Sequence, residues 1–221
     1  MRALVTFAIL SAFTGIACSD DPAEPTVEVP TVTFAATSLT TPFLTAGTTA
    51  APTVEWNGDT GTFALAAAVQ GVTVDATTGV VSWDPSLAIG VSTVDVVATN
   101  SAGSTTVSLM IDSEFQGAFS GGYNNDPTMQ TTPNAFDMTF NADGTMSVSD
   151  GGSAGEGTWT RSGTTVTSVY SYDGGTNFFT VEGDVTHTAT DAELEGFWYV
   201  GDTATAGSEA GYLNVAMMVT P

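Results

Sequence analysis

The stretch from Gly71 to Pro85 reads GVTVDATTGVVSWDP, and residues 94–103 read VDVVATNSAG. Apolar and polar residues alternate on both sides of a Thr-Thr-Gly turn, so Val81 and Trp83 share one face of an extended segment. Gly79 suits the turn because glycine adopts a positive φ without steric cost. The pattern predicts two strands joined by a tight turn, followed by a long connection and a further hairpin.

This run resembles the dystroglycan-type cadherin-like family of Ig-like domains, which occurs in bacterial surface proteins. The resemblance implies an Ig-like β-sandwich that acts as a spacer or an adhesion module, and we expect it over residues 31–112. Some cadherin relatives bind calcium through acidic clusters at domain junctions, whereas the acidic residues of this segment are scattered singly. Calcium takes roughly six to eight converging oxygen ligands. We therefore expect exposed surface acids, with Asp112 and Glu114 at the junction as the remaining calcium candidates.

Residues 113–221 contain many short apolar segments separated by turn pairs such as Asp143-Gly144 and Ser162-Gly163. Strands that follow one another through such turns form an antiparallel meander, which closes into a small barrel or remains a strongly curved sheet. The fold class is therefore all-β in both halves of the chain. The strands expected in this half are Gly117–Tyr123, Ala135–Asn141, Thr145–Asp150, Gly155–Arg161, Thr164–Tyr172, Asn177–Gly183, Ala192–Val200 and Gly211–Thr220.

Three short elements in this half occur in the order FNADGT at Phe140–Thr145, GEGTWT at Gly155–Thr160, and LEGFW at Leu194–Trp198. Together they resemble the lipocalin-like domains of bacterial lipoproteins. The resemblance implies an antiparallel β domain, and it raises the alternative of a carrier for a small apolar or glycan ligand. An unfilled apolar cavity would favour the carrier, whereas a packed interior would favour a structural role.

Aromatic residues of the same half are the candidates for facing a ligand. Core packing is the alternative, because aromatic side chains dominate β cores whatever the function. Three consecutive aromatic residues at positions 197–199 place rings on both faces of one strand, so at least one ring should lie outside a barrel. The ligand-facing candidates are Trp159, Tyr170, Tyr172, Phe197, Trp198 and Tyr199.

The N-terminal segment has the pattern of a secretory signal, with Arg2 ahead of a short apolar stretch at residues 3–17. The chain's single cysteine, Cys18, follows it, and the stretch before Cys18 resembles a bacterial lipobox. This resemblance implies a signal peptide at residues 1–17 and lipidation of Cys18. Residues 18–30 are acidic and proline-rich, which is typical of an extended tether. Within the tether, Ser19, Asp20 and Asp21 resemble the acidic tag that directs lipoproteins to the cell surface.

The charge balance excludes several classes of function. The chain carries 24 acidic residues against two basic ones, with a formal net charge of −22. Nucleic-acid binding is excluded because too few cations are present to neutralise phosphates. His187 is the single histidine, and no Gly-x-Ser-x-Gly motif accompanies it, so we expect no enzyme.

These observations predict an outer-membrane lipoprotein that faces the cell surface and acts as a non-enzymatic binding, adhesion or structural display module. Its expected partners are the membrane, through the lipid anchor, and a surface glycan or protein. The lipocalin-like carrier is the alternative, and calcium-dependent adhesion is the third hypothesis. Apart from calcium in that third case, no cofactor is expected.

Overall fold

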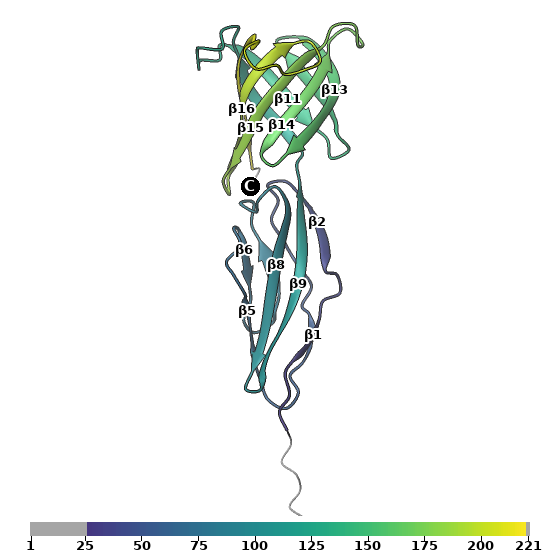
Figure 1. Ribbon diagram of the computed structural model, residues 1–221, viewed down its shortest axis with the longest axis vertical. Coiled ribbons are helices and arrows are strands. Elements are labelled where there is room, and N and C mark those ends of the chain that lie inside the picture. Colours follow the sequence, from purple (N-terminus) through teal and green to yellow (C-terminus); the bar gives the residue numbers. More distant parts are fainter. Residues whose placement is uncertain (1–25, 220–221) are drawn as a thin grey trace, which may run out of the picture.

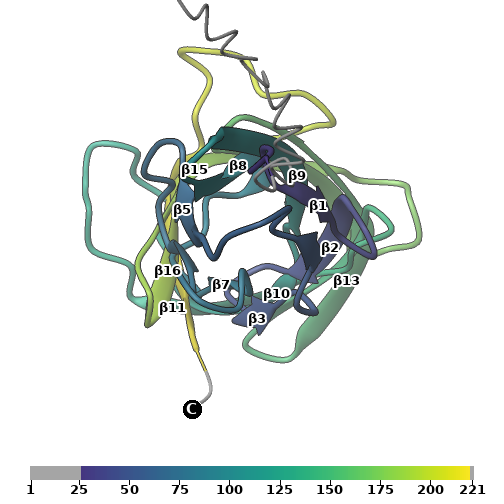
Figure 2. The same cartoon turned by 90° about the horizontal axis from the view of Figure 1, so that it is seen from below.

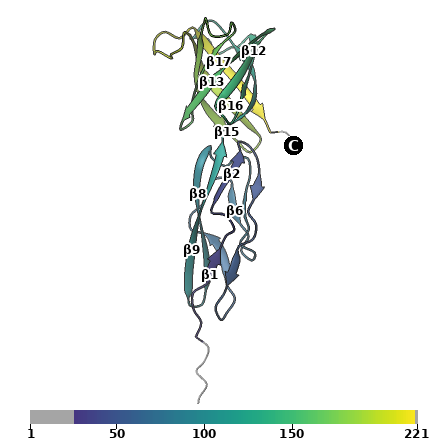
Figure 3. The same cartoon turned by 90° about the vertical axis from the view of Figure 1, so that its right-hand side faces the viewer.

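The computed structural model describes residues 26–219. In this part of the chain all regular secondary structure is β, and the strands form an elongated molecule with a barrel stacked on a sandwich (Figures 1 and 3). The expectation of an all-β fold is confirmed. Within residues 26–219, no helix has the length and the apolar character needed to span a membrane.

The sandwich is built from a four-stranded sheet in the order β2-β9-β8-β5, a three-stranded sheet in the order β3-β7-β6, and the pair β1-β4. Buried Val81, Val94, Leu109 and Ile111 belong to its core. The strands are β1 (Thr31–Thr33), β2 (Ser38–Pro42), β3 (Gly47–Thr48), β4 (Thr53–Glu55), β5 (Thr62–Leu65), β6 (Val72–Val74), β7 (Val81–Trp83), β8 (Gly90–Asn100) and β9 (Gly103–Glu114).

The two turns expected in the sandwich are present. Between β6 and β7, Gly79 has a φ of 72°, and the Asp75 carboxylate accepts hydrogen bonds from two backbone N–H groups of the turn. Between β8 and β9, the Asn100 side chain accepts from the N–H groups of Ala102 and Gly103. Local side-chain bonds of this kind fix tight turns, which sets the register of the hairpins.

The second half of the chain forms a closed barrel of eight strands in sequence order. The expected meander of eight strands is thus confirmed, and of the two forms considered it is the closed barrel. Its strands are β10 (Gly117–Tyr123), β11 (Asn134–Phe140), β12 (Thr145–Asp150), β13 (Ser153–Ser162), β14 (Thr165–Ser171), β15 (Phe179–His187), β16 (Asp191–Val200) and β17 (Gly211–Met218).

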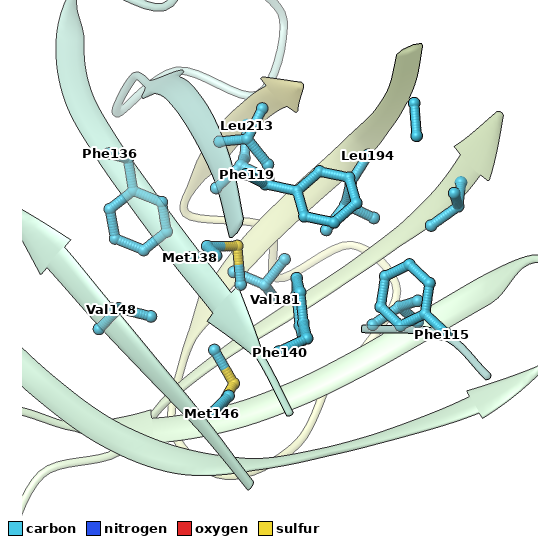
Figure 4. Packing of buried hydrophobic residues seen from close by; sticks show 14 of the residues in the cluster. Phe115, Phe119, Phe136, Met138, Phe140, Met146, Val148, Val181, Leu194 and Leu213 are labelled. Atoms are coloured by element: carbon cyan, nitrogen blue, oxygen red, sulfur yellow. The ribbon is translucent and has the colours of Figure 1, made fainter. Parts of the chain in front are cut away.

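Large apolar side chains fill the middle of the barrel. Phe119, Met138, Leu194 and Leu213 are each at most 1% exposed, and Figure 4 shows side chains from different strands pointing into the same interior. Gly183 of β15 and Gly196 of β16 are paired across the two strands. The strands approach so closely there that a Cβ added to Gly196 would lie 2.4 Å from the Cα of Gly183. The interior of the barrel is therefore a packed core rather than a deep open calyx.

The sandwich closes one end of the barrel. Phe43 and Leu44 follow β2 of the sandwich, yet they belong to the hydrophobic cluster of the barrel. The Phe43 ring lies 5.4 Å from Phe115 and 5.2 Å from His187, measured between ring centroids. The view along the long axis shows the barrel strands around the same axis as the sandwich (Figure 2). The boundary expected between residues 112 and 113 falls inside β9, which continues to Glu114.

Candidate functional site

A cavity of about 230 Å³ opens at the end of the barrel that faces away from the sandwich. Strands β10, β12, β14 and β16 run towards this end, and their antiparallel neighbours run away from it. The residues that line the cavity therefore lie at or just beyond strand ends that are far apart in sequence. We call this space the mouth pocket; its lining is Tyr123, Asn125, Phe136, Asp150, Tyr170, Tyr172, Phe179, Trp198 and Leu213.

Five aromatic side chains form a closed ring of contacts around the mouth pocket. Neighbouring centroids are separated by 5.7 Å, 6.0 Å, 5.8 Å, 6.3 Å and 6.1 Å on going round the ring. Separations in this range are typical of favourable edge-to-face and offset aromatic pairs. The five rings come from five different strands, so closure of the barrel is what brings them together. We call this set the aromatic collar; in order it is Tyr123, Phe136, Tyr170, Phe179 and Trp198.

Asn124 fixes one side of the mouth pocket. Its side-chain NH₂ donates to the carbonyl oxygens of Met129 and Thr131, each at 2.7 Å, and so folds the β10–β11 loop. Its side-chain oxygen accepts from the N–H of Tyr212 at 3.0 Å. The backbone carbonyl of Asn124 accepts from Trp198 Nε1 at 2.7 Å, which fixes the orientation of the indole ring.

Tyr172 and Asp150 form the polar part of the pocket wall. The Tyr172 hydroxyl donates to Asp150 Oδ2 at 3.1 Å. Burial raises the pKa of both Tyr170 and Tyr172 well above the ordinary value of 10.0, and the negative charge of Asp150 adds to this increase. Burial also raises the pKa of Tyr123, again with a contribution from Asp150. The tyrosines of the pocket are therefore neutral phenols at physiological pH. The negative charge of the pocket comes from the Asp150 carboxylate.

No basic side chain belongs to the lining of the pocket. The two side chains of the barrel that can carry positive charge, Arg161 and His187, lie at the opposite end, against the sandwich. Arg161 lies beside Gly90, and His187 lies against Leu87 and Phe43. The mouth pocket thus combines aromatic rings with one carboxylate, in a chain whose net charge is −22.

Three of the six ligand-facing candidates line the pocket, namely Tyr170, Tyr172 and Trp198. Trp159 points into the barrel at the other end, where its ring packs 5.2 Å from Phe115. Phe197 and Tyr199 project from the outer face of β16, because successive residues of a strand alternate between its two faces. Phe197 packs there against Tyr212, while Tyr199 is buried outside the collar. These three candidates therefore do not line the mouth pocket, and the outward positions of Phe197 and Tyr199 agree with the expectation that at least one ring of residues 197–199 lies outside the barrel.

Six of the lining residues are not among the six ligand-facing candidates: Tyr123, Asn125, Phe136, Asp150, Phe179 and Leu213. Strand alternation could have indicated some of them. Phe136, Met138 and Phe140 alternate with polar residues in the sequence, so the three share one face of β11. Because β11 begins at Asn134, Phe136 is also the apolar residue of that face nearest the mouth. Which strand ends meet at the mouth depends on how the barrel closes, and no local sequence pattern specifies that closure.

The remaining candidates lie elsewhere. Asp112 is half-buried and Glu114 is exposed, both on β9. Over residues 26–219, no group of three or more His, Cys, Asp or Glu side chains is arranged to hold a metal ion. Cys18, Ser19, Asp20 and Asp21 lie outside the described residues.

Fold and site together define the class: an all-β protein with a sandwich followed by a closed eight-stranded antiparallel barrel whose free end carries an aromatic pocket. No protein-family model matches the chain, and a search of the curated proteins gives no match.

Proposed function

We propose that the chain is a lipid-anchored, non-enzymatic binding module of the bacterial cell surface that presents the mouth pocket to its surroundings. The observation that carries this proposal is the position of the pocket. It lies at the end of the barrel opposite the sandwich, whereas β1, the first strand after the tether, lies towards the far end of the sandwich (Figure 1). A chain anchored through Cys18 would therefore hold the pocket away from the membrane.

The size of the pocket suits a small ligand or one chemical group of a larger ligand. Its volume of about 230 Å³ lies below the range of roughly 300–1,000 Å³ that is typical of pockets for drug-sized molecules. The packed interior beneath it leaves no deep calyx in which a lipocalin-like carrier would enclose a small apolar or glycan ligand. Binding at the mouth, with the rest of the ligand outside, is therefore preferred to the carrier hypothesis.

The anchor is tested on cells. We expect wild-type protein to incorporate labelled palmitate and a Cys18→Ser variant to incorporate none. External protease should remove the barrel from intact cells if the protein faces outwards. Wild-type protein without label, or full protection of the barrel until the cells are broken, would contradict the surface proposal.

Binding is tested by a thermal-unfolding screen of the detergent-solubilised full chain against small cations, neutral apolar compounds and methyl glycosides. A ligand that binds only the folded state raises the midpoint by mass action. We expect at least one class to raise it, and we expect Phe179→Leu to weaken the shift while Phe197→Leu does not. The second variant is the matched control because Phe197 is a partly exposed aromatic residue outside the pocket. Equal shifts in both variants would place binding elsewhere.

A further inference from the structure

The faces and edges of the aromatic collar surround a space that also contains a carboxylate. Aromatic rings carry partial negative charge on their faces, so the ring faces that are turned towards a cavity attract a cation. Aromatic rings are also poor substitutes for the water around a strongly hydrated cation, which favours a cation whose charge is covered by alkyl groups. The Asp150 carboxylate adds a full negative charge at the wall of the same cavity.

The hydrogen-bonding groups of the pocket argue against a sugar as its ligand. Sugar recognition needs several free donors and acceptors, and two of the donors in the lining are already used within the protein. Trp198 Nε1 donates to the backbone carbonyl of Asn124, and the Tyr172 hydroxyl donates to Asp150. A buried sugar hydroxyl that reaches none of the remaining polar groups would be left without a partner, which weakens binding.

The charges of the pocket argue against an anion. A carboxylate or phosphate ligand would meet Asp150 with no basic residue in the lining to offset the repulsion. Arg161 lies at the junction with the sandwich, where it contacts the backbone of Gly163, and so cannot serve this end of the barrel.

Resting on the proposed binding function, we propose that the mouth pocket binds an organic cation with a methylated ammonium group. The ammonium group would sit within the aromatic collar and beside the Asp150 carboxylate. The volume of about 230 Å³ admits such a head group, and the open mouth leaves room for whatever the head group is attached to.

The experiment is calorimetric titration of the full chain, solubilised in a neutral polyoxyethylene detergent, with three probes, of which the first two are matched in size. Choline is the cation, 3,3-dimethyl-1-butanol is its uncharged isostere, and methyl glucoside is the sugar. Because aromatic ring faces in a desolvated site attract the cation but not its uncharged isostere, we expect choline to bind roughly tenfold or more tightly than the isostere.

Two pairs of variants locate the effect. Asp150→Asn removes the charge but can still accept from Tyr172, and Phe179→Leu removes a ring but keeps an apolar side chain. Each should weaken choline binding several-fold and change the binding of the isostere less. The controls are Asp137→Asn and Phe197→Leu, which change exposed residues outside the pocket, and we expect wild-type affinity in both.

The outcomes separate the inference from the function on which it rests. Equal affinity for choline and its isostere, lost in Phe179→Leu, would overturn the cation proposal and leave a pocket for neutral ligands. Preferential binding of methyl glucoside would also overturn it, in favour of glycan binding. Choline binding that neither Asp150→Asn nor Phe179→Leu weakens would place the cation elsewhere. If none of the three probes binds, the cation proposal fails, and the wider thermal screen decides whether the pocket has another ligand.

Discussion

His187 Nε2 lies 3.1 Å from the backbone carbonyl oxygen of Leu87, across a sequence separation of 100 residues. Because a carbonyl oxygen only accepts hydrogen bonds, the Nε2–H of His187 is the donor. This bond joins the end of β15 in the barrel to the loop before β8 in the sandwich. Together with the packing of Phe43 against His187, it makes the two parts of the molecule share one interface.

The shared interface predicts that a residue of the sandwich stabilises the barrel. Phe43 is 3% exposed, and replacing such a phenylalanine by alanine typically costs about 3–5 kcal/mol. We expect Phe43→Ala to lower the free energy of unfolding by an amount in that range, measured by denaturant titration with tryptophan fluorescence and circular dichroism. Val91→Ala is the control, because Val91 is 63% exposed. A barrel that keeps wild-type stability in Phe43→Ala would disprove the coupling.

Asn124 is predicted to control the order of the β10–β11 loop. Its buried side chain makes bonds to two loop carbonyls and accepts from the N–H groups of Asp126 and Tyr212. Asn124→Ala should destabilise the protein by about 1–3 kcal/mol and speed hydrogen exchange at those two amides. Asn125→Ala, which changes an exposed neighbour, should leave both exchange rates unchanged. Unchanged exchange in Asn124→Ala would mean that packing alone orders the loop.

All five tyrosines of the chain are predicted to titrate above the ordinary pKa of 10.0. Burial is the first cause of the raised pKa in each of Tyr123, Tyr170, Tyr172, Tyr199 and Tyr212. The folded state thus binds these protons more tightly than the unfolded state. Their contribution to stability is complete below pH 10 and is lost as the pH rises above it.

Absorbance at 295 nm during alkaline titration checks this prediction. We expect little phenolate at pH 10 and a steep rise that coincides with unfolding. Asp150→Asn should lower the pKa of Tyr172 by removing a nearby negative charge, although burial keeps the pKa above 10.0. A tyrosine that titrates at its ordinary pKa while the protein is folded would refute the expectation for that residue.

Acid is predicted to loosen the β14–β15 loop through Asp173. Hydrogen bonds from Ser171 and from the backbone and side chain of Asn177 hold the pKa of Asp173 well below the ordinary 3.8. The ionised form is thus preferred in the folded loop. Its contribution is fully present above pH 3.8 and is lost as the pH falls below that value towards the lowered pKa.

Nuclear magnetic resonance can follow this titration through the carboxyl carbon of Asp173 and the amide exchange of Thr176. We expect the carboxylate to stay ionised below pH 3.8 and the exchange of Thr176 to rise when it is protonated. In Asp173→Asn the exchange should be faster at neutral pH and should no longer depend on this protonation. An ordinary pKa for Asp173 would show that the loop does not need the charge.

Local sequence was sufficient for the elements of the fold and for part of the pocket. Alternating apolar residues on β11 and the glycine-containing turns predicted an all-β chain and the succession of eight strands, because strand period and turn chemistry are local properties. Of the six aromatic candidates, Tyr170, Tyr172 and Trp198 line the pocket, whereas the other three, Trp159, Phe197 and Tyr199, lie elsewhere.

The tertiary structure alone decided which of these residues meet. Whether a meander closes depends on pairing between its first and last strands, here Ser120–Tyr123 of β10 with Leu213–Ala216 of β17, and no single segment specifies that pairing. Closure brings the collar residues of five strands to one end and leaves the other end for Phe43 of the sandwich. The sequence thus determined the strands and the strongly negative charge, whereas the pocket follows from long-range packing that acts only once the barrel has formed.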